Sequence, residues 1–307
     1  HQEARRQRQM CIRDRYSLLF LVLPCGLVPI ASSRAQGATQ IKDIWQGPSS
    51  GVCVLPRVIT ASLGEVALFP ANDGIRGCEL WRTDGTAAGT CLVRDIVPGI
   101  GGSNPMLHSA SEASAWARVG GVIVFGADDG ISGYEPWYSD GTEAGTGLLK
   151  DVAPGALRSL PDSFIAVGDH AYFKADNLAV GGSTLWKTDG TPGGTVLIQG
   201  AGQCNGVPLV AYKGRLFFIA GSAGNGSELW VTDGTNAGTV QFVDIYPGFQ
   251  SAFPRNVAIA AGELWFTAVS PNGLGVWRSD GTVAGTTEVK TFPGGGIGGS
   301  EPDQFTG

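Results

Sequence analysis

One motif of twelve residues occurs five times in this chain of 307 residues. The first copy reads ELWRTDGTAAGT at residues 79–90, and every copy fits W-x-[TS]-D-G-T-x-x-G-T. The repeat tryptophans are Trp81, Trp137, Trp186, Trp230 and Trp277, with spacings of 56, 49, 44 and 47 residues. Such a recurrence cannot arise by chance, so the chain is built from one structural unit that is repeated.

Each repeat contains four short apolar runs that are separated by Gly- and Asp-rich turns. The chain has 48 glycines and only 16% charged residues, which favours many tight turns over long surface helices. No stretch of twelve or more residues after residue 35 has the apolar period of a helix. The pattern therefore predicts four antiparallel strands in each repeat.

A four-stranded unit of about 45–50 residues that recurs several times is the signature of a β-propeller blade. A β-helix rung is much shorter, and a β-sandwich would not repeat its turn chemistry in every copy. We therefore predict an all-β propeller domain at residues 36–307. Its complete blades are expected at about 56–96, 106–152, 161–199, 208–245 and 254–292.

The two ends of this domain predict partial blades. Residues 41–44 (IKDI) match a fourth strand that no motif precedes, and residues 300–307 begin a further first strand. The expectation is a ring of at least six blades that is truncated at its C-terminus, with five blades complete.

The five copies closely resemble the ELWxxDGT repeat of bacterial secreted and surface proteins. The resemblance covers about residues 41–300 and is carried by Trp, Asp-Gly-Thr and Gly-Thr at fixed spacing. Pro136 replaces the motif's Leu in the second copy, and Thr184 and Gly275 replace its leading Glu. The resemblance implies a repeat scaffold outside the cytoplasm and attaches no reaction to it.

Residues 1–35 predict a secretory signal peptide. An apolar run at residues 16–30 follows basic residues, and residues 33–35 fit a small-x-small cleavage site. The alternative of a membrane anchor is disfavoured because the run is shorter than the ~20 residues that a spanning helix needs. Pro24 disfavours lipidation of Cys25. We expect an extracellular, periplasmic or cell-surface protein with no membrane span after cleavage. Residues 10–15 look like a translated adaptor, so residues 1–15 need not belong to the natural protein.

The remaining chain is acidic and carries four cysteines. It has 15 Lys and Arg against 25 Asp and Glu, a net charge of about −10, which argues against nucleic acid and anionic membranes as partners. Export permits disulfides among Cys53, Cys78, Cys91 and Cys204, but the sequence leaves the pairing open. The absence of a CxxC pattern argues against a zinc site.

The signature residues of the repeat are interpreted as structural. We expect the tryptophans to pack between neighbouring blades, with sugar stacking as the alternative. The motif aspartates are expected to begin a turn and to accept hydrogen bonds from its own N–H groups. These residues are Asp84, Asp140, Asp189, Asp233 and Asp280. The glycine that follows allows a positive φ, and the Thr hydroxyl can bond locally.

The acidic loops at residues 71–79 and 127–135 form the candidate metal site. Their carboxylates, with glycines between them, are typical of calcium loops. The candidate ligands are Asp73, Glu79, Asp128, Asp129 and Glu135. The complete calcium-loop pattern is absent and the later repeats lose most of these carboxylates, so a purely structural loop is the main expectation and no other cofactor is predicted.

Catalytic motifs are scarce in the sequence. It contains no G-x-S-x-G, H-E-x-x-H or P-loop pattern. The glycine tract at residues 294–299 matches G-x-G-x-x-G, but Pro302 follows it instead of a helix, so it is interpreted as a loop between blades. The least repetitive segment, residues 106–119, holds His108, Glu112 and Trp116 as candidate ligand-binding residues.

Three functions are compatible with these features. The preferred hypothesis is an exported, non-enzymatic scaffold that binds a glycan or a protein at the cell surface. The second is a propeller glycosidase or lyase, with carboxylates such as Asp162, Glu112 and Asp303 at the ring axis. The third is a purely structural module of a longer surface protein.

Overall fold

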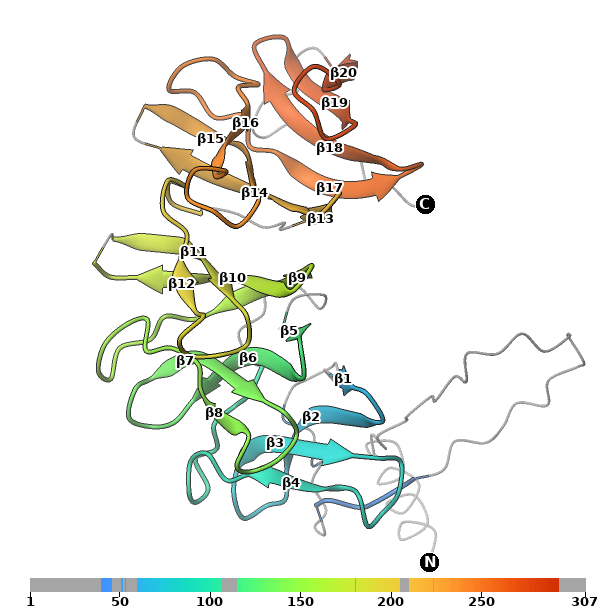
Figure 1. Cartoon of the computed structure of the whole chain (residues 1–307), viewed down its shortest axis with the longest axis vertical. Helices are drawn as coiled ribbons and strands as arrows, with labels where there is room; N and C mark the ends of the chain where they lie inside the picture. Colours follow the sequence, from blue (N-terminus) through green and yellow to red (C-terminus); the bar gives the residue numbers. More distant parts are fainter. Residues whose placement is uncertain are drawn as a thin grey trace, which may run out of the picture.

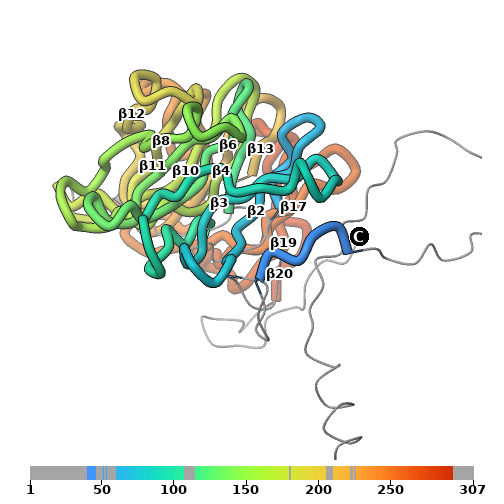
Figure 2. Tube along the Cα trace, turned by 90° about the horizontal axis from the view of Figure 1, so that it is seen from below, coloured from blue at the N-terminus to red at the C-terminus, as the bar shows by residue number. Residues whose placement is uncertain are grey.

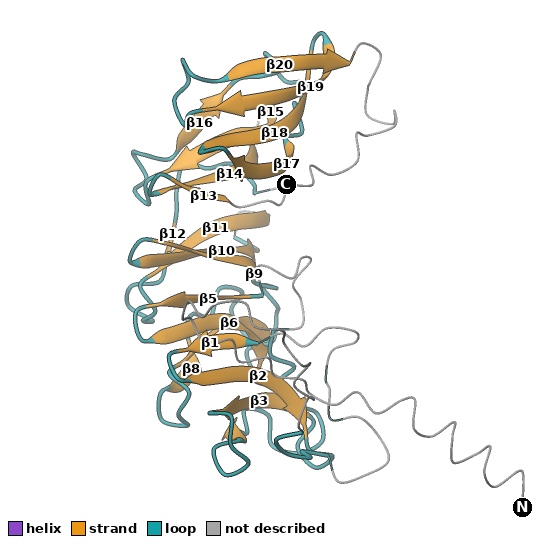
Figure 3. Ribbon diagram, turned by 90° about the vertical axis from the view of Figure 1, so that its right-hand side faces the viewer, coloured by secondary structure: helices purple, strands orange, loops and turns teal. Residues whose placement is uncertain are grey.

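The computed structural model describes residues 40–45, 51, 53, 60–106, 115–179, 181–204, 210–222 and 224–292 (Figure 1). Within these ranges the chain forms strands and loops and no helix (Figure 3). The strands make five sheets of four antiparallel strands each, and each sheet follows the order of the sequence. These observations confirm the predicted all-β class and the four-stranded antiparallel unit.

The strand bounds are as follows. The first sheet contains β1 (Ala61–Leu63), β2 (Val66–Asn72), β3 (Cys78–Thr83) and β4 (Cys91–Arg94). The second contains β5 (Trp116–Val119), β6 (Val122–Asp128), β7 (Tyr134–Ser139) and β8 (Thr146–Leu148). The third contains β9 (Asp162–Val167), β10 (His170–Asn177), β11 (Gly182–Thr188) and β12 (Val196–Leu197). The fourth contains β13 (Val210–Tyr212), β14 (Arg215–Ser222), β15 (Asn225–Thr232) and β16 (Val240–Val243). The fifth contains β17 (Arg255–Ala260), β18 (Glu263–Ser270), β19 (Gly273–Ser279) and β20 (Thr287–Phe292).

The sheets follow one another with their first strands in contact, so β1, β5, β9, β13 and β17 form the common inner side. In Figure 2, which views the molecule from below, the sheets overlap one behind another. The first and fifth sheets lie at opposite ends of the molecule in Figure 1. The described sheets therefore form an open series of blade-like units, and closure into a ring is not observed.

The repeat tryptophan occupies the interface between successive sheets. In all five sheets it pairs across the strands with a phenylalanine of the second strand, as Trp186 does with Phe173. Trp137 shares a buried cluster with Leu68 and Leu80 of the first sheet. Trp186, Trp230 and Trp277 likewise pack with residues of the sheet that precedes them. The side chains of Trp137, Trp186, Trp230 and Trp277 thus lie between successive sheets.

The segment before the first sheet takes the place of a preceding fourth strand without forming one. Residues 41–44 are not in a strand, which corrects the sequence-based expectation. Nevertheless, Lys42 Nζ donates to the carbonyl of Thr90, just as Arg94 of β4 donates to the carbonyl of Thr146 in the next sheet. Ile44 packs beside Trp81.

The outer face of the fifth sheet is uncovered among the described residues. Val289 and Phe292 follow their repeat tryptophan at the same intervals as Val93 and Ile96 in the first sheet. Val93 and Ile96 are 5% and 8% exposed beneath the second sheet, whereas Val289 and Phe292 are 50% and 41% exposed. The fifth sheet therefore presents an interface for another sheet that none of the described sheets fills.

Candidate functional site

The Asp-Gly-Thr turn is closed by a hydrogen-bond network between its Asp and Thr side chains and its own backbone. Asp84 Oδ1 accepts from both the N–H and the hydroxyl of Thr86, and the Thr86 hydroxyl accepts from the N–H of Gly89. Thr90 Oγ1 donates to the carbonyl of Thr86 and contacts Thr83 Oγ1 at 2.6 Å. Gly85 has a φ of 89°, which is why the motif needs glycine there.

The same network recurs at Asp140, Asp189, Asp233 and Asp280. The hydrogen bonds from Thr side chains and backbones lower the pKa of four of these carboxyls, those of Asp84, Asp189, Asp233 and Asp280. Each of these aspartates accepts two hydrogen bonds from its own turn. The motif aspartate therefore has a structural role in every repeat, which is to stabilise the turn.

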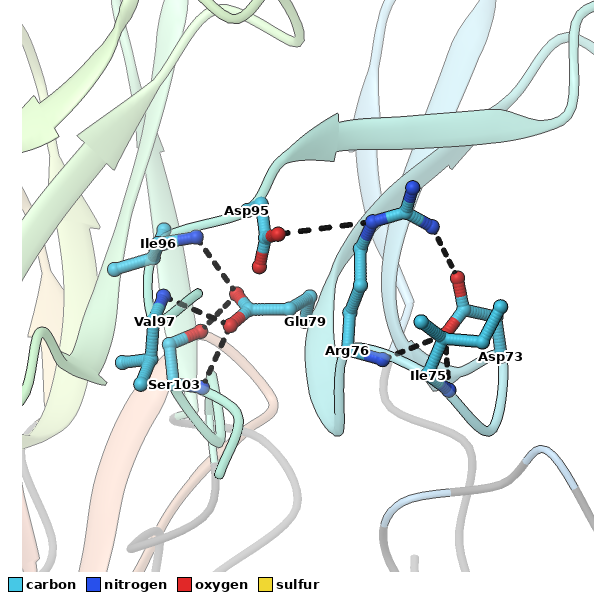
Figure 4. Close-up of polar contacts among 8 residues, drawn as sticks. All are labelled: Asp73, Ile75, Arg76, Glu79, Asp95, Ile96, Val97 and Ser103. Atoms are coloured by element: carbon cyan, nitrogen blue, oxygen red, sulfur yellow. Dashed lines mark hydrogen bonds and ion pairs between the residues drawn. The ribbon is translucent and has the colours of Figure 1, made fainter. Parts of the chain in front are cut away.

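The leading glutamate of the motif fastens the loop that connects one sheet to the next. Glu79 is fully buried at the start of β3 (Figure 4). Its carboxylate accepts from the backbone N–H groups of Ile96, Val97 and Ser103 at 3.0–3.2 Å, and from the Ser103 hydroxyl at 2.5 Å. The loop amides thereby find the acceptor that buried backbone groups require.

We call this arrangement, in which a buried glutamate accepts hydrogen bonds from the amides of the connecting loop, a carboxylate cradle. The second and fourth sheets contain the same arrangement. Glu135 accepts from the amides of Val152, Ala153 and Ser159 and from the Ser159 hydroxyl. Glu228 accepts from the amides of Ile245 and Ala252. Burial raises the pKa of both carboxyls to about 7, although the hydrogen bonds act in the opposite direction. Sequence reasoning missed this role, whose signal is a Ser 24 residues after the Glu in the first two copies.

The candidate calcium ligands do not converge. Asp73 accepts from the N–H groups of Ile75 and Arg76 and pairs with the Arg76 guanidinium, while Glu79 points to the loop on the other side of Arg76 (Figure 4). In the second sheet Asp128 and Asp129 cap their own loop, and Glu135 is turned to its cradle. Within the described residues no group of three or more His, Cys, Asp or Glu side chains can hold a metal ion.

The third sheet lacks the glutamate of the carboxylate cradle. Thr184 stands in the position of the glutamate, and its hydroxyl accepts from Trp186 Nε1 and donates to the carbonyl of Ala175. The loop that follows is shorter, since Gln203 lies 19 residues after Thr184. A cavity of about 430 Å³ opens at this place, lined by Thr184 and residues 197–203.

The other predicted site residues are dispersed. His108 and Glu112 lie outside the described residues. Trp116 is in β5 and is half-buried against the core between the first two sheets. Asp162, a candidate acid for an enzyme, forms an ion pair with Lys174 at 3.3 Å.

The four cysteines divide into one disulfide and two free thiols. Cys53 and Cys78 form a disulfide with a Cα–Cα distance of 5.5 Å, which ties the segment before the first sheet to β3. Cys91 is exposed and free, whereas Cys204 is free and buried. Burial raises the pKa of the Cys204 thiol to about 12.

Comparison with known proteins gives structural likeness only. No protein-family model matches the chain, and no curated protein matches it in sequence. It is similar to a puromycin hydrolase complexed with PGG, with 16% identity, 74% of this chain and 35% of that chain covered, and a TM-score of 0.42. A Mycobacterium tuberculosis puromycin-hydrolyzing peptidase gives 14% identity, coverage of 76% and 37%, and a TM-score of 0.44. A chain of a nidogen–laminin complex gives 13% identity, coverage of 77% and 80%, and a TM-score of 0.36.

The chain thus spans little more than a third of the length of the two hydrolases. In the described part of the chain, no helix has the length and apolar character to cross a membrane.

Proposed function

We propose that this chain is an exported, non-enzymatic scaffold of propeller blades that binds a protein at the cell surface. The observation that carries the proposal is the division between repeated and unrepeated side chains. The repeated Glu, Trp, Asp and Thr side chains are all engaged in cores, cradles and turns. Recognition of a partner therefore falls to positions that vary between the repeats, most of which lie in loops.

The varied loops place large apolar side chains in water along one edge of the sheets. The loop from the second to the third strand and the loop that leaves the fourth strand both lie at the end of the sheet where the third strand begins. Their tips carry Ile75, Ile131, Ile100, Leu157 and Phe249, which are 53% to 86% exposed. We name this set the loop rim. Exposed apolar side chains that gather at one edge are typical of protein interaction sites.

The charge of the chain sets limits on this partner. With the predicted signal peptide removed, the chain carries a net charge of about −10. A nucleic acid or an anionic membrane would be repelled at long range, whereas a neutral or basic protein would not. A glycan partner is less well matched because only Phe249 in the loop rim offers an aromatic face for a sugar ring.

The scaffold is proposed to close into a ring with at least one further blade. The support is the uncovered apolar face around Val289 and Phe292, whose counterparts in the first sheet are buried by the next blade. Export to the cell surface rests on the predicted signal peptide and on the resemblance to the ELWxxDGT proteins. The test of export is to express the chain with its leader and to ask whether the processed protein leaves the cytoplasm.

The test of partner binding uses purified protein on intact bacterial cells of the source. The variants Ile100→Ser, Ile131→Ser and Phe249→Ser should each weaken binding, because apolar contacts at the loop rim are lost. Val283→Ser is the matched control, since Val283 is 61% exposed in an Asp-Gly-Thr turn at the opposite edge. Binding that survives all three rim variants, or that protease treatment of the cells leaves intact, would contradict a protein partner at the loop rim.

A further inference from the structure

The third sheet contains the amides of a carboxylate cradle without the carboxylate. Trp186 pairs with Leu197 as Trp81 pairs with Leu92, so Ala201 and Gly202 correspond to Ile96 and Val97. Gln203 corresponds to Ser103, because the N–H of the next residue in each sheet donates to the carbonyl just before the glutamate position. Cys204 donates to Ser183, and Asn104 donates to Cys78. In the first sheet, the amides of Ile96, Val97 and Ser103 donate to Glu79.

No described residue accepts a hydrogen bond from the N–H groups of Ala201 or Gly202, whereas Gln203 pairs with Gly221 in an antiparallel bridge. The neighbouring amides are satisfied, since Ile198 donates to the carbonyl of Leu185 and Gln199 donates to Oδ1 of Asn236. Ala201 and Gly202 both line the cavity of about 430 Å³. Adjacent backbone N–H groups that face one concave space are a common way for proteins to bind anions.

The third sheet is also the one repeat in which no carboxylate is near this position among the described residues. The fifth sheet has Gly275 in place of the glutamate, but a Cβ built on Gly275 would lie only 2.2 Å from Glu288 Oε1. A carboxylate oxygen of β20 thus occupies the space beside Gly275, although Glu288 Oε1 has no hydrogen-bond partner among the described residues. In the third sheet Thr184 is too short to reach the amides, and the space remains open.

We propose that the cavity of the third sheet binds the carboxylate of a small organic acid. The ligand's carboxylate takes the place that Glu79 and Glu135 occupy in their own sheets and accepts from the amides of Ala201 and Gly202. Leu197, Ile198 and Thr184 bound the space in which the body of the acid lies. The inference concerns this cavity alone and is independent of partner binding at the loop rim.

The test uses D-glucuronate as the probe, with D-glucose as its neutral analogue and sodium chloride at equal ionic strength as the blank. Glucuronate should raise the Tm of the unaltered chain by roughly 2–5 °C near saturation, because a ligand that binds only the folded state stabilises it. Glucose and sodium chloride should leave the Tm unchanged. A response to glucose equal to that of glucuronate, or no response to glucuronate, would overturn the proposal.

The variant Thr184→Glu should supply the missing carboxylate from within the chain. We expect it to raise the Tm without ligand and to abolish the response to glucuronate. Val196→Glu is the matched control: it adds the same charge on an exposed position of β12 in the same sheet and should keep the response.

A separate measurement on the unaltered chain does not depend on the folding of any variant. Titration with glucuronate should shift the amide proton resonances of Ala201 and Gly202 downfield, as expected for new hydrogen bonds to a carboxylate. Shifts confined to other residues, with these two amides unaffected, would place any binding elsewhere and contradict the proposal.

Discussion

The carboxylate of Asp189 fills the space that a side chain on Gly194 would need. A Cβ built on Gly194 would lie 2.1 Å from Oδ1 of Asp189, and the corresponding distance in the other four turns is 2.0 to 2.1 Å. The motif's Asp and its second Gly therefore form one unit, in which the turn closes tightly around the carboxylate.

This contact predicts a sharp difference between two adjacent glycines. Gly194→Ala should lower the free energy of unfolding by about 1–3 kcal/mol, the usual cost of overpacking. Gly193→Ala is the matched control, because a Cβ on Gly193 would meet nothing within 4 Å, and it should change stability by less than about 0.5 kcal/mol. Urea unfolding of the two variants measures the difference.

A double variant separates this contact from other effects on the turn. In an Asp189→Ala background the cost of Gly194→Ala should be much smaller, because the carboxylate that it displaces is gone. An unchanged cost would mean that the backbone of the turn, and not Asp189, excludes the methyl group.

The buried glutamates predict that stability falls as the pH rises from about 5 to about 7.5. The pKa of Glu135 is raised to about 7 in the folded chain from an ordinary value of 4.5, so between these values the folded state holds a proton that the unfolded state has released. By linkage this contribution is fully present below pH 4.5 and is lost as the pH rises through 7.

Each unit by which the pKa is raised corresponds to about 1.4 kcal/mol of unfolding free energy. Glu135 therefore contributes roughly 3 kcal/mol to stability at most. Glu135→Gln should flatten the pH profile of urea unfolding, whereas Glu143→Gln, at an exposed turn position, should not. Aspartates with lowered pKa, such as Asp84, act at lower pH and do not enter this window. Parallel profiles for the unaltered chain and Glu135→Gln would contradict the raised pKa.

The local part of this structure follows from the sequence, and the longer-range part does not. The turn at Asp84 was predictable because its donors and acceptors lie within four residues of one another. The link from Glu79 to Ser103 spans 24 residues, across a loop whose length varies between repeats. Thr184 was visible as a departure, but its consequence depends on knowing what the glutamate binds in the other sheets. The partner of Cys78 likewise lies in a segment without a repeat to guide the prediction.

The free thiols predict selective alkylation. Iodoacetamide at pH 8 should modify the exposed Cys91 quickly, and Cys204 only after denaturant is added, because Cys204 is 1% exposed and its pKa is raised to about 12. Peptide mass spectrometry resolves the two sites. Modification of Cys204 at the rate of Cys91 in native protein would show that the short loop of the third sheet opens readily.

Substitution of two tryptophans tests whether the outer face of the fifth sheet is packed as tightly as the interfaces between sheets. Trp186 is 6% exposed between the second and third sheets, so Trp186→Ala should cost roughly 3–5 kcal/mol of unfolding free energy. Trp265 of β18 pairs with Ala258 as Leu68 pairs with Ala61, and it lies half-buried on the uncovered face of the fifth sheet. Trp265→Ala should therefore cost less than half as much, because little packing is lost there. An equal cost for both variants would mean that this face is covered in solution, by a second copy of the chain or by a segment of its own.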